Sequence, residues 1–160
     1  MSADPVPPPV LPVVTSAVAN QSEQECTLCA RLRRFTSDDL VHESELWVAY
    51  TMDVYPWMIT LATRRHNAGL VDLTAREAAE LGPLSVAVGS AMTAVWTDRV
   101  YLVAYNEGVT HFHAGLLTSC PEVSSAARAA MRERAERDGG AIAEAREGAR
   151  KVRDLLRSRG

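Results

Sequence analysis

The middle of the chain carries short apolar runs that predict strands. Residues 46–51 and 57–63 are rich in β-branched and aromatic side chains, and the turn between them suits a hairpin. Residues 99–105 and 111–117 predict two further strands, because Asn106-Glu107-Gly108 between them is a tight-turn signal.

Two stretches have helical rather than strand character. Residues 26–35 predict a short helix, whose arginines near the C-terminal end suit the helix dipole. Thr74-Ala75-Arg76-Glu77 matches a capping box and opens a long helix. Pro83 is expected to kink this helix or delay its start, because an interior proline costs about 3 kcal/mol. The apolar positions at three- and four-residue steps form one stripe: Leu81, Leu84, Val88, Met92 and Val95.

The two ends of the chain differ in composition from the middle. Residues 1–22, with five prolines between Pro5 and Pro12, predict a disordered or polyproline leader that lacks the basic start of a signal peptide. Residues 121–160 are rich in Ala, Arg and Glu and predict two helices divided at Gly139-Gly140. We expect a solvated helical extension there, with a lid or a dimer contact as the alternative. Residues 23–120 then form the folded domain.

The order of elements predicts an α+β fold with a mostly antiparallel sheet. Composition narrows the class further, since 160 residues with 47% hydrophobic and 23% charged residues suit one globular domain. A net charge of −3 gives no electrostatic basis for nucleic-acid binding. No apolar run approaches the ~18 residues that cross a bilayer, so no membrane partner is expected. Three cysteines, an odd number, fit a reducing compartment, so we expect a cytoplasmic protein.

The cysteines and histidines suggest a metal site. Cys26 and Cys29 form a CxxC pair, but a redox role would require a preceding strand, which the polar segment before Cys26 does not predict. His66 follows a predicted strand, and His111 and His113 lie two apart on another, so a strand would place both rings on one face. Two thiolates and two imidazoles form a tetrahedral zinc set, in which spacing alone allows either His111 or His113. Buried free cysteines with hydrogen-bonded histidines are the alternative.

Three segments together resemble the histidine-triad (HIT) superfamily, which includes nucleoside phosphoramidases, dinucleoside polyphosphate hydrolases and galactose-1-phosphate uridylyltransferase. The first is the CxxC that opens the short helix. The second is Leu61-Ala62-Thr63-Arg64-Arg65-His66 followed by Leu70-Val71-Asp72-Leu73-Thr74. The third ends in His111-Phe112-His113-Ala114-Gly115-Leu116-Leu117, which is similar to the triad strand H-φ-H-φ-H-φ-φ. The resemblance covers about residues 24–118.

The resemblance implies a five-stranded, mostly antiparallel sheet with one long helix, a short N-terminal helix stapled by zinc, and a C-terminal helical extension outside it. It implies Zn²⁺ bound by Cys26, Cys29, His66 and His111. It makes His113 the nucleophile, which attacks the α-phosphorus and forms a nucleotidyl-imidazole intermediate. A backbone carbonyl or a neighbouring polar group is expected to hold the other ring nitrogen of His113.

The sequence departs from the family pattern near this nucleophile. The third triad position, a His or Gln that contacts phosphate in the family, is Gly115, and the loop before His111 contains only Val109 and Thr110. The position of the ribose-binding acidic residue falls on Tyr50, with Asp53 nearby. Arg65 is a further cation that can compensate for the missing phosphate contact. The expected substrate-binding residues are therefore Asn106, Thr110, Arg64, Tyr50 and Asp53.

Two functions fit these residues. The first is a nucleotide hydrolase or nucleotidyltransferase that acts on a phosphoester, phosphoanhydride or phosphoramidate through His113. The alternative is a zinc-stabilised scaffold that has lost phosphotransfer and binds or converts a non-nucleotide small molecule. The aromatic residues then line an apolar pocket or simply pack in the core: Trp47, Tyr50, Tyr55 and Trp57. A catalytic metal needs an open coordination position, which four protein ligands do not leave. The resemblance also implies a homodimer.

Overall fold

The chain folds around one antiparallel sheet with helices on both faces. The computed structural model describes residues 22–51, 57–96, 99–104, 108–118, 133 and 140–159. The strands are β1 (Leu40–Glu43), β2 (Trp47–Thr51), β3 (Met58–Thr63), β4 (Val100–Val103) and β5 (His113–Thr118), in the order β1-β2-β3-β5-β4. The helices are α1 (Thr27–Leu32), the 3₁₀ turn η1 (Leu70–Asp72), α2 (Ala75–Val95) and α4 (Gly140–Arg159). The predicted fold class is confirmed.

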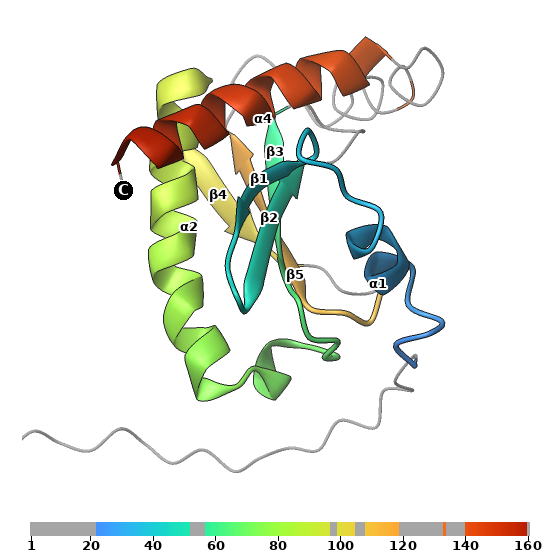
Figure 1. Cartoon of the computed structure of the whole chain (residues 1–160). Helices are drawn as coiled ribbons and strands as arrows, with labels where there is room; N and C mark the ends of the chain where they lie inside the picture. The colour runs from blue at the N-terminus through green and yellow to red at the C-terminus, as the bar shows by residue number, and fades with distance from the viewer. Residues whose placement is uncertain are drawn as a thin grey trace, which may run out of the picture.

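The two faces of the sheet carry different helices (Figure 1). α2 and α4 cover one face, and the much shorter α1 lies against the other. Because side chains alternate across a strand, β3 sends Ile59 and Leu61 towards α2 and Thr60 and Ala62 towards the opposite side. The sheet therefore has a large core on the α2 side and a small one on the α1 side.

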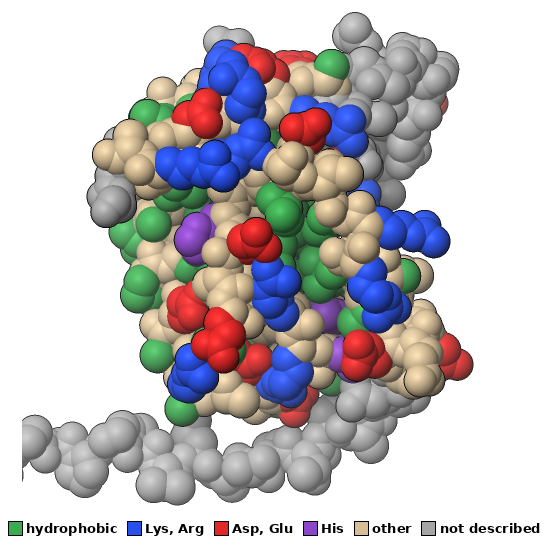
Figure 2. All heavy atoms as spheres, viewed as in Figure 1, with side chains coloured by type: hydrophobic (Ala, Val, Ile, Leu, Met, Phe, Trp, Pro, Cys, Tyr) green, Lys and Arg blue, Asp and Glu red, His purple; other side chains and the backbone are tan. Residues whose placement is uncertain are grey.

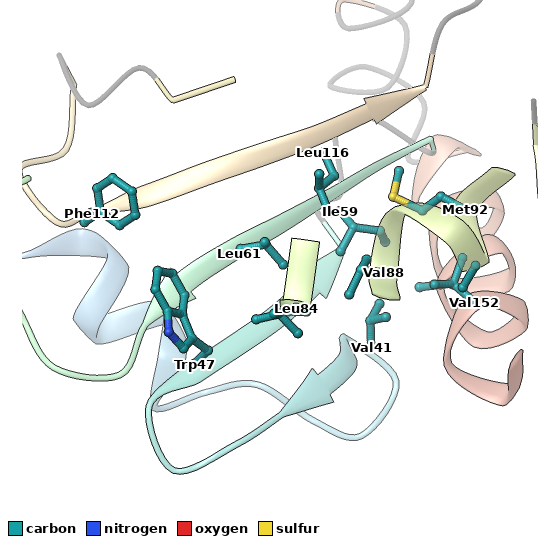
Figure 3. Close-up of a cluster of buried hydrophobic side chains, with 13 residues drawn as sticks. Val41, Trp47, Ile59, Leu61, Leu84, Val88, Met92, Phe112, Leu116 and Val152 are labelled. Carbon is teal, nitrogen blue, oxygen red and sulfur yellow. The ribbon is translucent and has the colours of Figure 1, made fainter. Parts of the chain in front are cut away.

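The larger core explains why the predicted stripe of α2 is apolar. Figure 3 shows Leu84, Val88 and Met92 pointing at the sheet, where they meet Ile59 and Leu61. Leu81 and Val95 are partly buried against the same cluster. The ring of Phe112 packs edge-on against that of Trp47, with centroids 6.0 Å apart. Trp47 thus belongs to this core rather than to a ligand pocket.

The long helix α2 begins as the sequence predicts and continues through its proline. Thr74 and Glu77 form the reciprocal capping box, and Pro83 lies inside the helix without delaying its start. By length and composition α2 is able to cross a membrane, with a mean hydropathy of 1.3, which corrects the expectation that no run approaches that length. A core helix passes the same test, and here the apolar stripe packs on the sheet.

The C-terminal helix α4 packs on the domain. Its buried residues Ala149 and Val152 belong to the core on the α2 side, and Ala145 is buried as well. A Cβ on Gly148 would lie 2.2 Å from the ring of Trp96, so glycine lets this ring close against α4. The pair of Glu147 with Lys151 forms as predicted, at 3.5 Å. Apart from residue 133, the rest of the predicted C-terminal extension lies outside the described residues. Residues 1–21 of the leader and Asp53, Tyr55, Asn106 and Cys120 also lie outside them.

An ion pair fastens the start of α2 to the segment that precedes His66. Arg65 donates to both carboxylate oxygens of Glu77, at 3.1 and 2.8 Å, and to the carbonyl of Asp72. Glu77 also accepts from the backbone N–H of Thr74, and its own carbonyl accepts from the indole of Trp47. The Glu77 side chain is only 2% exposed, so its negative charge depends on these donors.

Replacement of Glu77 should therefore destabilise the fold in a pH-dependent way. The hydrogen bonds from Arg65, working against burial, lower the pKa of Glu77 from 4.5 to about 2. Because the folded-state pKa is depressed, the stabilisation is complete above pH 4.5 and is lost as the pH falls to about 2. This corresponds to about 3 kcal/mol at neutral pH, reduced towards ~2 kcal/mol by screening at the half-exposed Arg65.

Denaturant unfolding at pH 7 measures the loss of unfolding free energy in Glu77→Gln. When the measurement is repeated at lower pH, the difference in unfolding free energy between the variant and the native chain should shrink. The control is Glu144→Gln on the exposed face of α4. Equal losses in the two variants would contradict the role of Glu77.

Candidate metal centre

The sulfur atoms of the CxxC are positioned by the start of α1. Cys26 is the N-cap of this helix, and its Sγ accepts from the backbone N–H of Cys29 at 3.4 Å. Cys29 lies in the first turn, so both sulfur atoms are on the same end of α1. Both residues are buried against the sheet, together with Leu28 and Val48.

The two imidazoles reach these sulfur atoms from the sheet. His66 lies just after β3, beyond Arg64 and Arg65. His111 precedes β5, which begins only at His113, so the prediction that both histidines lie on one strand is corrected. The N–H of His111 instead donates to the carbonyl of Val109, and this turn directs the His111 ring towards α1.

The four donor atoms have the spacing of a metal site. Sγ of Cys29 lies 3.4 Å from Nδ1 of His66 and 3.2 Å from Nδ1 of His111, and Sγ of Cys26 lies 3.6 Å from the latter. All four donors are within 4.8 Å of one another. A tetrahedral ion with bonds of about 2.3 Å to sulfur and 2.0 Å to nitrogen places such donors about 3.5 Å apart. The cluster can hold a metal ion, and its donor set fits zinc.

The protonation of this cluster suits a cation. His111 Nε2 lies 2.8 Å from the carbonyl oxygen of Thr63, so it carries the proton and Nδ1 has its lone pair towards the sulfur atoms. Burial lowers the pKa of His111 from its ordinary value, which keeps the ring neutral. Burial, with the neighbouring Cys26, raises the pKa of the Cys29 thiol to about 12. The Cys29 proton is therefore retained until a metal ion displaces it.

A polar network that the sequence did not suggest holds the two histidine segments together. The side-chain oxygen of the buried Asn67 accepts from the hydroxyl of Thr63 at 2.6 Å. The backbone carbonyl of Asn67 accepts from the N–H of Phe112 at 2.9 Å. Thr63 and Phe112 are also joined directly through their backbones. Asn67 directly follows His66 in the sequence. A polar residue next to a candidate metal ligand is the one sequence signal that could have indicated this network.

His113 lies beside the metal cluster without belonging to it. Its Nδ1 is 2.7 Å from the carbonyl oxygen of His111, which confirms that a backbone carbonyl holds this nitrogen. An Nδ1–H donor leaves the lone pair of the neutral ring on Nε2. His113 is half-buried, at the first position of β5, opposite Ala62 of β3.

The side chain of His113 lines a cavity of about 650 Å³. Figure 2 shows a hollow with hydrophobic side chains between the sheet and α1, with Lys or Arg side chains over α1 beside it. Residues of α1, the segment after it, β2, the loop before β5 and α4 complete the lining: Thr27, Leu28, Ala30, Arg31, Arg34, Phe35, Asp39, Tyr50, Thr51, Val109 and Arg146. Tyr50, one of the predicted substrate-binding residues, thus lines the same cavity as His113.

The other predicted substrate-binding residues are distributed differently. Arg64 donates to the carbonyl of Ser44, pairs with Glu43, and lines a separate hollow with Cys29 and Arg33. Thr110 is half-buried directly before His111 but is not among the residues that line the His113 cavity. Arg65 is held by Glu77.

Gly115, which the sequence comparison predicted to be the third position of a triad, is closed in by apolar side chains. Gly115 lies opposite Thr60 in β3 and Val103 in β4, on the same face as His113. A Cβ at Gly115 would be 2.8 Å from the terminal methyl of Met58 and 3.1 Å from Cδ1 of Leu117. Met58 therefore occupies the space into which a side chain at position 115 would project.

Comparison with solved structures places this architecture among known folds. A scan against models of protein families finds no match, and a search of curated proteins finds none. A Hit-like protein from Bartonella henselae matches with a TM-score of 0.63 at 13% identity, over 82% of this chain and 97% of that one. A Zn-bound histidine triad family protein from Mycobacterium smegmatis matches with 0.64 at 14%, over 86% and 96%.

A third match extends the comparison to a larger protein. A structure of uridylyltransferase gives a TM-score of 0.62 at 16% identity, over 83% of this chain and 45% of that one. Sequence identities this low show that the fold is shared, and they show nothing about activity or ligands. The chain therefore has a HIT-like fold: a five-stranded antiparallel sheet with one long helix, a short N-terminal helix and a C-terminal helix.

Proposed function

We propose that this chain is a zinc-stabilised HIT-like hydrolase or nucleotidyltransferase that uses His113 as its nucleophile. Zn²⁺ would be held by Cys26, Cys29, His66 and His111. The substrate would be a phosphoester, phosphoanhydride or phosphoramidate, with a nucleotide as the transferred group. The HIT-like fold shared with the uridylyltransferase structure supports this class of reaction.

The chemistry of the donor set supports a structural role for zinc. Two thiolates and two imidazoles form a complete tetrahedral shell, so no position is left for a reacting water. The ion would neutralise the two thiolates and fix α1 against the sheet. A helix of six residues is too short to be stable alone, so this cross-link would define the wall of the cavity.

The observation that carries the catalytic proposal is the hydrogen bond from His113 Nδ1 to the carbonyl of His111. This bond fixes the ring orientation and the tautomer, so the lone pair is on Nε2, the nitrogen that would attack. It would also stabilise the positive charge that the ring gains during the attack. Nε2 would form a bond to phosphorus while the bond from phosphorus to the leaving group breaks. The leaving group departs with the electron pair, and water or an acceptor then displaces His113 from phosphorus.

A second function is favoured by one specific observation. Met58 and Leu117 close the position where the family places a phosphate-contacting side chain. This favours the alternative, a scaffold that binds or converts a non-nucleotide small molecule without phosphotransfer. The cavity, with Phe35, Leu28 and Val109 in its lining, is apolar enough for such a ligand.

A homodimer is the proposed partner state. In α2, 28% of the apolar window is buried, and the outward Val86 is 69% exposed. The edge strand β4, which neighbours α2, presents Tyr101 and the 52%-exposed Leu102. An apolar helix face beside an open sheet edge suits a second copy in a two-fold arrangement, which would cover both.

Loss of His113 should abolish covalent transfer. We expect the native chain, mixed with an AMP or UMP donor, to gain the mass of one nucleotidyl group at neutral pH. His113→Ala should gain none and should lower turnover by about 10³-fold or more. His42→Ala, an exposed histidine on β1, is the matched control. No adduct with any donor, together with no turnover of any donor by the native chain, would remove the enzymatic proposal in favour of the scaffold.

Zinc should bind with one ion per chain and should contribute to stability. His66→Ala should lose the ion and unfold at lower denaturant, whereas His42→Ala should retain it. Because the Cys29 thiol, with its pKa of about 12, must release its proton, apparent zinc affinity should rise with pH. Elemental analysis and chelator titration measure these effects. A metal content near zero in the native chain would contradict the site.

A charge on the apolar outer face should separate the proposed dimer. We expect Val86→Asp and Leu102→Asp to be monomers under conditions where the native chain is a dimer, since burying an unpaired carboxylate is costly. Ser158→Asp on exposed α4 is the control. Light scattering after size exclusion gives the mass, and a monomeric native chain at all concentrations would disprove the arrangement.

A further inference from the structure

We propose that the His113 cavity recognises the anionic group of a phosphorylated ligand through two arginines of the α1 segment, Arg31 and Arg34. Both side chains line this cavity together with His113. The inference adds a ligand class to the site of the proposed function and depends on that site being the one used. It assigns phosphate recognition to α1, whereas the usual contact on β5 is replaced here by Gly115.

The three arginines of the α1 segment, Arg31, Arg33 and Arg34, lie on two different sides of it. Arg31 and Arg34 are three residues apart, and the N–H of Arg34 donates to the carbonyl of Arg31 at 2.9 Å, which continues the helical turn. Residues at this spacing lie on one side of a turn. Arg33 lies on the other side, where it pairs with Glu23 at 3.7 Å and lines a different hollow with Arg64. Arg31 and Arg34 therefore share the cavity because of their spacing.

Among the described residues that line the cavity, arginines outnumber the acidic residues, of which Asp39 is the one present. Asp39 and Arg146, both in the lining, pair with each other at 3.1 Å. Burial opposes ionisation of Asp39, but hydrogen bonds from Thr36 and the Arg146 charge hold its pKa below the ordinary value. Asp39 thus stays ionised and balances Arg146. Arg31 and Arg34 are the two further cationic residues among the described residues of the lining, and a pair of guanidinium groups suits an anion.

Other residues of the lining fit the rest of such a ligand. Burial raises the pKa of Tyr50 to about 12, so its phenol stays neutral and adds no charge that would repel phosphate. Its ring lies 4.6 Å from that of Phe35, and Leu28 and Val109 extend this apolar wall. A guanidinium binds phosphate through two parallel hydrogen bonds, which apolar surroundings strengthen.

Equilibrium binding to the zinc-loaded full-length chain tests this assignment. The probes for calorimetry are AMP, ribose 5-phosphate and inorganic pyrophosphate, with adenosine as the uncharged comparison. We expect phosphate-bearing probes to bind and adenosine to bind at least about a hundredfold more weakly than AMP, because adenosine loses the contacts to both arginines. Arg31→Gln and Arg34→Gln should each weaken the phosphate probes by about tenfold or more, since a charged hydrogen bond is lost. Arg33→Gln, the matched control, should change affinity by less than about twofold, because its ion pair is exposed.

The arms of the experiment separate the sources of the anion. Binding of AMP alone identifies a nucleotide, whereas equal binding of all three probes identifies the phosphate group itself, and both outcomes support the proposal if Arg31 and Arg34 are required. Failure of every phosphate probe to bind at millimolar concentration would overturn it, as would equal affinity for AMP and adenosine. An equal loss in Arg33→Gln would also overturn it. Because binding needs no transfer step, arginine-dependent binding without a His113 adduct would retain this inference and remove the enzymatic proposal.

Discussion

The meeting of two thiols and two imidazoles between α1 and the sheet is the constraint on which the rest of the site depends. α1 has six residues and a small apolar contact with the sheet, through Leu28, Cys29 and Val48. Such a helix gains little from its own hydrogen bonds, because nucleation is costly and propagation is short. Its position is therefore set by the side chains at its N-terminus. Whatever α1 carries towards the cavity, including Arg31, is placed by the Cys26–Cys29 end of the same helix.

His111 connects this structural centre to the proposed reactive group. Its ring faces the sulfur atoms, its Nε2 is held by the carbonyl of Thr63, and its own carbonyl holds Nδ1 of His113. A displacement of His111 would thus alter both metal coordination and the tautomer of the neighbouring ring. Asn67 also fixes the position of His111, because its hydrogen bond with Phe112 joins the segment after His66 to the residue that follows His111. The Cys26–Cys29–His66–His111 cluster and His113 are therefore connected through His111, and their two proposed roles depend on the same residue.

Much of this architecture could be predicted from the sequence, because it depends on local patterns. The capping box at Thr74, the α2 stripe and four strands follow from residue spacing, and the CxxC with two histidines indicated the cluster. Other features depend on distant parts of the chain and leave no local signal. The turn that takes His111 out of β5 depends on hydrogen bonds to Val109 and Asn67. Likewise, the arginines after Cys29 read as helix-dipole partners, and only the packing of α1 on the sheet brings Arg31 and Arg34 to the cavity.

The apolar closure at Gly115 leaves no polar side chain there, so the arginines of α1 become the candidates for contact with an anion. A donor on β5 would contact a phosphate from the same strand as the nucleophile, at a fixed distance from Nε2. Arginines on α1 are longer and act from another wall of the cavity, so they can neutralise charge that lies away from phosphorus as well as at it. Glycine at position 115 is therefore compatible with the proposed recognition of an anion, provided that α1 stays fixed to the sheet at its Cys26–Cys29 end.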